Sequence, residues 1–89
     1  MKFRYNEDKN IDLLKKRGIG FEEIIVEINN GNLIDIVSHH NTIKYPNQKI
    51  MMVRCLGNIF CVPYIIESKN IIFLKTLYPS RKATKKYLP

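Results

Sequence analysis

The sequence predicts a small α+β domain, in which two helices precede an antiparallel sheet of about four strands and a short helix follows it. Three observations predict this class: a capped segment near the N-terminus, apolar residues at helical spacing after it, and short apolar runs separated by turn residues from Leu33 onward. The 89 residues allow one domain, residues 1–89. No apolar run approaches the roughly 18–20 residues that cross a bilayer.

The first helix is predicted by its caps. A short strand at Phe3–Tyr5 leads to Asn6, which suits a helix N-cap, and acids follow it in the first turn. Basic residues fill the last turn, and Gly18 suits the position just beyond the end. We therefore expect a helix over Glu7–Arg17.

The second helix is predicted by periodicity. Gly20 opens it, glutamates occupy its outer positions, and Asn30-Gly31 ends it. Its apolar residues follow the i, i+3, i+4, i+7 pattern of an amphipathic helix: Phe21, Ile24, Ile25 and Ile28.

The rest of the chain has the pattern of strands. A polar segment, Ser38–Gln48, is long enough to form a mobile loop. Ser80 can cap a short helix over Arg81–Leu88. The expected strands are Leu33–Val37, Ile50–Leu56, Ile59–Ile66 and Ile71–Tyr78.

A two-residue hairpin turn at Gly57-Asn58 determines which side chains share a face. It pairs Cys55 with Phe60 and Arg54 with Cys61, and neighbours alternate between faces. The two cysteines then lie on opposite faces, where they can neither form a disulfide nor share a metal. We expect two free, buried thiols, consistent with a reducing cytoplasm.

A second turn that pairs Ile66 with Ile71 extends this register into the last strand and pairs Cys61 with Thr76. Arg54 is then a sheet-edge residue that reaches solvent or a residue that contacts phosphate. One face would hold Arg54, Thr76 and Tyr78, and the other Lys75, Phe73 and Leu77.

The charge is distributed unevenly along the chain. Residues 1–43 carry six Lys or Arg against seven acids, whereas residues 44–89 carry nine against a single acid, Glu67. So basic a half-domain favours a polyanionic partner, above all nucleic acid. An anionic membrane surface and simple solubility are the alternatives.

The acids do not suggest a metal centre. Metal-dependent nucleases need carboxylates clustered in the basic cleft, but the acidic pairs of this chain fall on the predicted helices, where a solvated face explains them. These i,i+4 pairs are Asp8 with Asp12 and Glu23 with Glu27. We expect no metal and no small-molecule cofactor.

Histidine is a usual acid or base for phosphodiester cleavage. The chain has one adjacent pair, His39-His40, in the polar loop, and exposure without a role is the alternative for both. The final segment, Tyr78–Tyr87, concentrates cations and tyrosines and contains no acid. Such a segment suits phosphates and base stacking, so we expect RNA contacts from Lys82, Lys85, Lys86 and Tyr87.

Two blocks of sequence resemble the BrnT family of toxins. The opening block is Tyr5–Asn10 followed by Leu14–Glu23, and the closing block is Ser80–Lys86. The resemblance implies a RelE-like fold, ribonuclease activity that inhibits translation, and a cognate small DNA-binding antitoxin as partner. The matching positions are Lys9, Gly18, Phe21, Glu22 and Arg81.

The chain departs from the family pattern at two positions. Arg17 stands where many members have histidine, and Thr76 stands where many have a basic residue on the last strand. Lys75 or Arg54 can substitute for that second cation. A degenerate toxin that only binds its antitoxin is therefore a further alternative.

The leading prediction is a metal-independent endoribonuclease that acts in the cytoplasm on free or ribosome-bound RNA. Arg81, with Arg54 or Lys75, would hold the phosphate. Proton transfer would fall to Tyr78 or Tyr87, to His39 or His40, or to a lysine. A non-catalytic basic module that binds nucleic acid or regulates another protein is the alternative from a different class.

Overall fold

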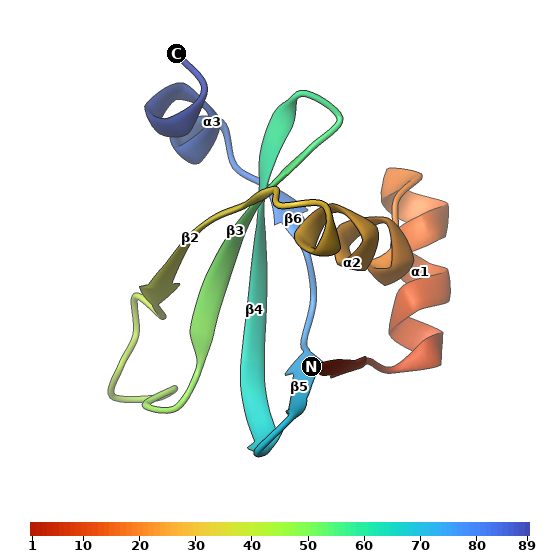
Figure 1. Ribbon diagram of the computed structural model, residues 1–89, viewed down its shortest axis with the longest axis vertical. Helices are drawn as coiled ribbons and strands as arrows, with labels where there is room; N and C mark the ends of the chain where they lie inside the picture. Colours follow the sequence, from red (N-terminus) through yellow and green to blue (C-terminus); the bar gives the residue numbers. More distant parts are fainter.

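The computed structural model describes residues 1–89 and shows an α+β domain (Figure 1). The predicted class is confirmed, with an N-terminal strand, two helices, a sheet and a short C-terminal helix. In chain order the elements are β1 (Lys2–Arg4), α1 (Glu7–Arg17), α2 (Phe21–Asn29), β2 (Leu33–Ser38), β3 (Lys49–Cys55), β4 (Asn58–Ser68), β5 (Ile71–Leu74), β6 (Tyr78–Pro79) and α3 (Arg81–Tyr87).

The sheet has six strands and is mixed, which corrects the prediction of about four antiparallel strands. The order is β1-β5-β4-β3-β2, and the short β6 pairs with β4 beyond the end of β5. β1 runs parallel to β5, while every other pair is antiparallel. The parallel pair joins segments far apart in the sequence, because β1 precedes both helices and β5 follows them.

The bounds of α1 are those that its caps predict. Asn6 Oδ1 accepts a hydrogen bond of 2.9 Å from the backbone N–H of Lys9. Gly18 lies just beyond the last turn with φ of 71°, and its N–H donates to the carbonyl of Leu14. Only glycine adopts this left-handed conformation without a steric cost.

The turn between α1 and α2 is held by a buried side chain. Asn10 Oδ1 accepts a hydrogen bond of 2.8 Å from the N–H of Phe21, at the start of α2. A Cβ atom at Gly20 would overlap that same amide oxygen. Glu23 Oε1 accepts from the N–H of Gly20 at 3.0 Å. Residues of the opening sequence block therefore join the two helices.

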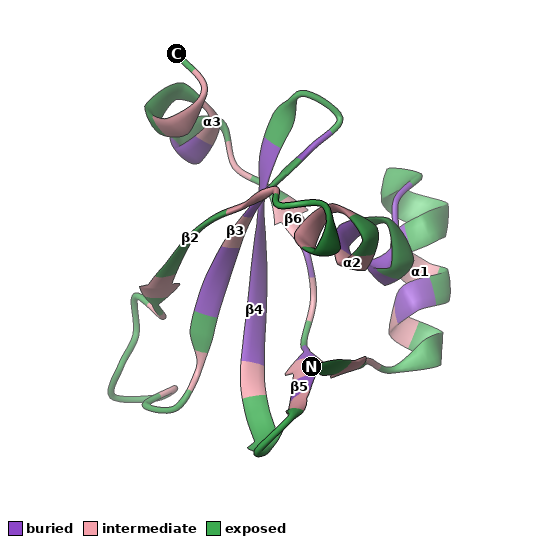
Figure 2. Ribbon diagram, viewed as in Figure 1, coloured by how far each residue is buried: buried purple, intermediate pink, exposed green.

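The main core lies between the sheet and the two N-terminal helices. Figure 1 shows α1 and α2 on one side of β4 and α3 on the other, and Figure 2 shows the buried residues concentrated in the central strands. The side of the sheet under α1 and α2 is called here the α1/α2 face, and the opposite side the α3 face. Largest among the fully buried side chains of the core are Phe21, Ile24, Val53, Val62, Leu74 and Leu77.

The β3–β4 turn is Leu56-Gly57, two residues formed one position earlier than predicted. Both residues have positive φ, 52° and 75°, as a type I′ turn requires. The observed pairs are therefore Arg54 with Ile59 and Cys55 with Asn58. The register differs from the prediction by two residues, so each side chain keeps its predicted face.

The two cysteines confirm that alternation. Cys55 belongs to the core on the α1/α2 face, whereas Cys61 is buried on the α3 face. Both thiols are free.

The β4–β5 register is wrong in the prediction by one residue. An irregularity between Ile66 and Ser68 makes Ile66 pair with Ile72 instead of Ile71. A shift of one residue exchanges the faces of a strand. Phe73 therefore lies on the α3 face, on the same side as Arg54 and not opposite to it.

The last predicted strand is interrupted at residues 75–77, which separates β5 from β6. Lys75 donates its N–H to the carbonyl of Pro63 at 2.8 Å, and its Nζ lies 5.8 Å from the centre of the Phe73 ring. Lys75 is thus on the α3 face. Leu77 turns into the core and Tyr78, in place of Thr76, pairs with Cys61.

Candidate nucleic-acid interface

The first turn of the short helix α3 is hydrogen-bonded to the first residues of β4. Ser80 donates its N–H to the carbonyl of Ile59 at 2.9 Å, and its hydroxyl caps the helix by accepting from the N–H of Ala83 at 3.1 Å. Thr84 Oγ1 accepts from the N–H of Ile59 at 2.9 Å. The helix predicted over Arg81–Leu88 ends one residue earlier, at Tyr87.

A hollow of about 200 Å³ lies between α3 and the sheet. Lys82 and Lys86 line it from the helix, one turn apart. Arg81 and Lys85 precede them by one residue, which is about 100° around a helix, and they lie outside the hollow and exposed. The other lining residues are Val37, Met52, Ser80, Ala83 and Tyr87.

Tyr78 lies beside Cys61 on the α3 face, and Cys61 contacts Met52, which lines this hollow. Burial raises the pKa of the Tyr78 phenol, and the neighbouring Cys61 raises it further. Burial also raises the pKa of the Cys61 thiol, although hydrogen bonds with Ser80 and Tyr78 oppose the shift. Cys61 Sγ lies 3.5 Å from Met52 Sδ. Tyr78 is thus a neutral phenol at physiological pH, able to donate a proton.

Two cations lie on the same face as this tyrosine. Along β4, Ile59, Cys61 and Pro63 are successive residues of the α3 face, spaced about 7 Å apart. Arg54 pairs with the first, Tyr78 with the second, and the backbone of Lys75 bonds to the third. The structure therefore places three of the predicted catalytic residues on one face: Arg54 lies across β4 from Lys75 and Tyr78.

Tyr87 is held at the other end of α3. Its hydroxyl donates to Asp35 Oδ2 at 2.7 Å, which joins the last turn of the helix to β2. This hydrogen bond lowers the pKa of Asp35, and it raises the pKa of Tyr87. Lys86 Nζ lies 5.1 Å from the centre of the Tyr87 ring.

The histidines lie away from these residues. Figure 1 shows the loop between β2 and β3 at the opposite end of the sheet from α3. His39 Nδ1 accepts from the N–H of Asn41 at 3.0 Å, and its ring stacks on His40 with 4.3 Å between centroids. Tyr45 lies 4.5 Å from the same ring. The structure does not bring either histidine to Tyr78 or α3.

Charge separates between the two sides of the sheet. Register and helix position give the α3 face eight cations: Lys2, Arg4, Arg54, Lys75, Arg81, Lys82, Lys85 and Lys86. Arg4 forms an ion pair of 2.9 Å with Glu67, and Asp35 is held by Tyr87. The three glutamates of α2, by contrast, lie on the α1/α2 side of the sheet. The α3 face is thus strongly electropositive.

Cys61 and Met52 complete the site, although the sequence did not single them out as partners of Tyr78. Strand alternation alone could have placed both on the face of Arg54. The pairing of Cys61 with Tyr78 required the interruption at residues 75–77. No group of three or more His, Cys, Asp or Glu side chains lies close enough together to hold a metal. None of the helices is both long and apolar enough to cross a membrane.

Comparison with known proteins returns no match among protein-family models, curated proteins or solved structures. The resemblance to BrnT toxins therefore rests on the two sequence blocks alone. Within the opening block, Asn10, Gly18 and Gly20 have the structural roles described above.

Proposed function

We propose that this protein is a metal-independent endoribonuclease toxin, with the α3 face as its RNA-binding surface. The observation that carries the proposal is that Tyr78 shares one electropositive face with Arg54 and Lys75. Four further cations on α3 border that face. Phosphates and bases of a single strand suit this combination of cations and an aromatic proton donor.

RNA supplies its own nucleophile in this proposal. The 2′-oxygen attacks the adjacent phosphorus, the bond from phosphorus to the 5′-oxygen breaks, and a 2′,3′-cyclic phosphate forms. Arg54 and Lys75 donate hydrogen bonds to the non-bridging oxygens, where negative charge develops. The Tyr78 phenol gives its proton to the departing 5′-oxygen, and the 2′-hydroxyl proton passes to solvent.

The helix α3 supplies binding in this scheme. Lys82 and Lys86 line the hollow between α3 and the sheet and would contact the flanking phosphates. Arg81, which the family resemblance implicates, begins α3 next to Ser80 and is exposed, so it is free to reach a phosphate. Its planar guanidinium suits two oxygens of one phosphate group.

The proposal includes the partners that the resemblance implies. A toxin of this class acts on RNA in the cytoplasm, and a cognate DNA-binding antitoxin restrains it. The alternative from another class, a basic module that binds RNA without cutting it, uses the same face. Only a cleavage assay separates the two.

The test is incubation of the purified protein with end-labelled single-stranded RNA in excess EDTA. Cleavage should persist and leave 2′,3′-cyclic phosphate or 3′-phosphate ends, and RNA with 2′-O-methyl groups should remain intact. Lys75→Ala should reduce the rate strongly, whereas Lys15→Ala, on the exposed last turn of α1, should not. Binding without cleavage would favour the non-catalytic module, and loss of cleavage with EDTA would refute the mechanism.

A further inference from the structure

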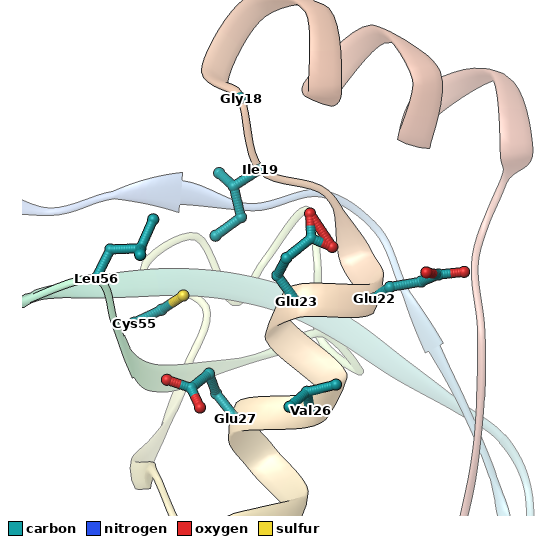
Figure 3. A pocket seen from close by; sticks show the side chains of 8 residues that line it. All are labelled: Gly18, Ile19, Glu22, Glu23, Val26, Glu27, Cys55 and Leu56. Carbon is teal, nitrogen blue, oxygen red and sulfur yellow. The ribbon is translucent and has the colours of Figure 1, made fainter.

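A second cavity lies on the side of the molecule away from α3. It has a volume of about 510 Å³ and separates α2 from the tip of the β3–β4 hairpin (Figure 3). Eight residues line it: Gly18, Ile19, Glu22, Glu23, Val26, Glu27, Cys55 and Leu56. This size falls within the range of natural binding pockets.

The interior of this groove is apolar. Ile19 and Cys55 form its floor, and both are almost completely buried. Its upper walls include Val26 and Leu56, which are 55% and 78% exposed. A groove with exposed aliphatic walls and a closed apolar floor can bury an apolar side chain from a partner.

Leu56 is an unusual residue at the tip of the hairpin. Its φ of 52° is left-handed, a conformation that asparagine or glycine adopts more readily than leucine. Its side chain is largely exposed and contributes little to the core. The leucine thus combines a disfavoured backbone conformation with an exposed apolar surface.

The rim of the groove is acidic. Glu23 and Glu27 lie one turn apart on α2, and Figure 3 shows both facing the opening, with Glu27 extending toward Cys55 and Glu22 pointing away. The ion pairs of the chain are Arg4–Glu67 and Lys16–Asp12, so neither carboxylate of this rim forms an ion pair within the chain.

Of these two carboxylates, Glu23 uses one oxygen to cap α2, and Glu27, although half-buried, has no hydrogen-bond partner. Both raise the pKa of the Cys55 thiol, after burial itself, which agrees with their place beside the floor.

From this arrangement we infer that the groove is a docking site for a cationic amphipathic segment of a partner protein. An apolar side chain of the segment fills the space between Leu56, Val26 and the floor. Lysine or arginine side chains on either side of it pair with Glu23 and Glu27. Charge complementarity favours this occupant, because two carboxylates without an ion pair line the rim in a chain of formal net charge +7.

This inference is independent of the proposed ribonuclease activity. The groove lies on the α1/α2 side of the sheet, and none of its lining residues belongs to the α3 face. A bound segment would leave Tyr78 and α3 accessible. The interaction is of the helix-in-groove or extended-peptide kind, with affinity from one apolar anchor and specificity from the acidic rim.

The test uses a defined probe. A fluorescent amphipathic peptide of leucine and lysine, with leucines on one helical face, is titrated into the isotope-labelled full chain at low salt. We expect saturable binding, with NMR shift changes confined to residues 18–27 and 55–56. A peptide with glutamate in place of every lysine should bind at least tenfold more weakly.

Two variants separate binding from folding. Leu56→Asn removes the apolar wall and suits the left-handed turn better, so it should preserve or raise the melting temperature while weakening the peptide at least tenfold. Ile43→Asn is its control, because Ile43 is 95% exposed and lies outside the groove. It should leave binding unchanged.

The charges are tested by a matched pair. Glu27→Gln and Glu22→Gln each remove one negative charge from α2, but only the Glu27 side chain faces the opening. The first should weaken binding several-fold and the second should have little effect. Equal effects would show that only net charge matters and would refute a specific site.

Other outcomes overturn the inference. Binding unaffected by Leu56→Asn would remove the groove from the interaction. Concentration-dependent dimers that Leu56→Asn abolishes would show that a second copy, through its basic α3, occupies the groove instead. RNA cleavage should be unchanged in Leu56→Asn, so failure of peptide binding with cleavage intact would reject the docking site alone.

Discussion

The phenol of Tyr87 donates a hydrogen bond of 2.7 Å to Asp35, and this contact closes the hollow between α3 and β2. Ser80 and Thr84 anchor the first turn of α3, so the Tyr87–Asp35 pair fixes the other end. The orientation of Lys82 and Lys86 therefore depends on a bond between two titratable groups.

The Tyr87–Asp35 bond should give α3 a pH-dependent stability. The pKa of Asp35 is lowered, so its contribution is present above the ordinary carboxyl pKa of about 4 and is lost as the pH falls through the folded value. The pKa of Tyr87 is raised, so its contribution is present below about 10 and is lost above the folded value. The protection of α3 amides against hydrogen exchange, relative to the intrinsic rate at each pH, should decrease on both sides of this window.

Asp35→Asn is the control for that measurement, because asparagine still accepts from the phenol but does not titrate in acid. It should abolish the loss of α3 stability at acid pH and keep the loss at alkaline pH, whereas Tyr87→Phe should abolish both. If α3 still loses stability at acid pH in Asp35→Asn, other titrating groups cause that loss.

The α1–α2 junction should be sensitive to a single methyl group. Gly20→Ala places a Cβ against Asn10 Oδ1 and Leu14, and thereby threatens the hydrogen bond from Phe21. We expect a loss of about 2–3 kcal/mol in the free energy of unfolding, measured with urea. Gly18→Ala has free space around its Cβ and should cost only about 1–2 kcal/mol, from its positive φ. Equal losses would contradict the steric role of Gly20.

The basic α3 should determine the salt dependence of RNA binding. Log affinity should fall with log salt at roughly −0.7 per neutralised phosphate of a single strand. Lys82→Ala and Lys86→Ala should each flatten that slope by about one contact, and Lys15→Ala on α1 should not. Binding that does not change with salt would exclude the α3 face as a phosphate-binding surface.

Tyr78 should determine the alkaline behaviour of cleavage. As a proton donor it must remain protonated, and its raised pKa keeps it so beyond the ordinary phenol value of about 10. The rate should therefore rise with pH through the neutral range and fall only above about 10. Tyr78→Phe should lower the rate about 10²- to 10⁴-fold and remove that decline, without weakening RNA binding. An unchanged rate in this variant would exclude the tyrosine as the acid.

Arg81 tests the family resemblance separately from the sheet. Arg81→Ala should reduce cleavage, and growth arrest on expression, by about 10²–10³-fold if its guanidinium stabilises the transition state. Lys85→Ala, one turn further on and equally exposed, should have a much smaller effect. Circular dichroism should remain unchanged in both, because neither side chain makes a hydrogen bond or ion pair in the folded chain. Undiminished arrest would show that Arg81 adds nothing to the phosphate contacts of Arg54 and Lys75.

The registers of β4 and β5 show which features of the sheet could not be predicted from the sequence. The predicted β3–β4 turn was displaced by one position, but the register changed by two, so Cys55 and Cys61 stayed on their predicted faces. The irregularity at Ile66–Ser68 changed the next register by one and moved Lys75 to the side of Arg54. A bulge of this kind has no signature in the alternation of apolar residues.

The sequence by itself determined what depends on neighbours in the chain. Asn6, Gly18 and Ser80 cap helices through atoms three or four residues away, so the bounds of α1 and the start of α3 could be predicted.

Only the tertiary structure decided what depends on distant segments. These features are the parallel pairing of β1 with β5, the place of Tyr78 opposite Cys61, and the groove between α2 and Leu56. Each joins residues through packing and sheet register, which are settled by burial of the whole core and not by local conformational preference.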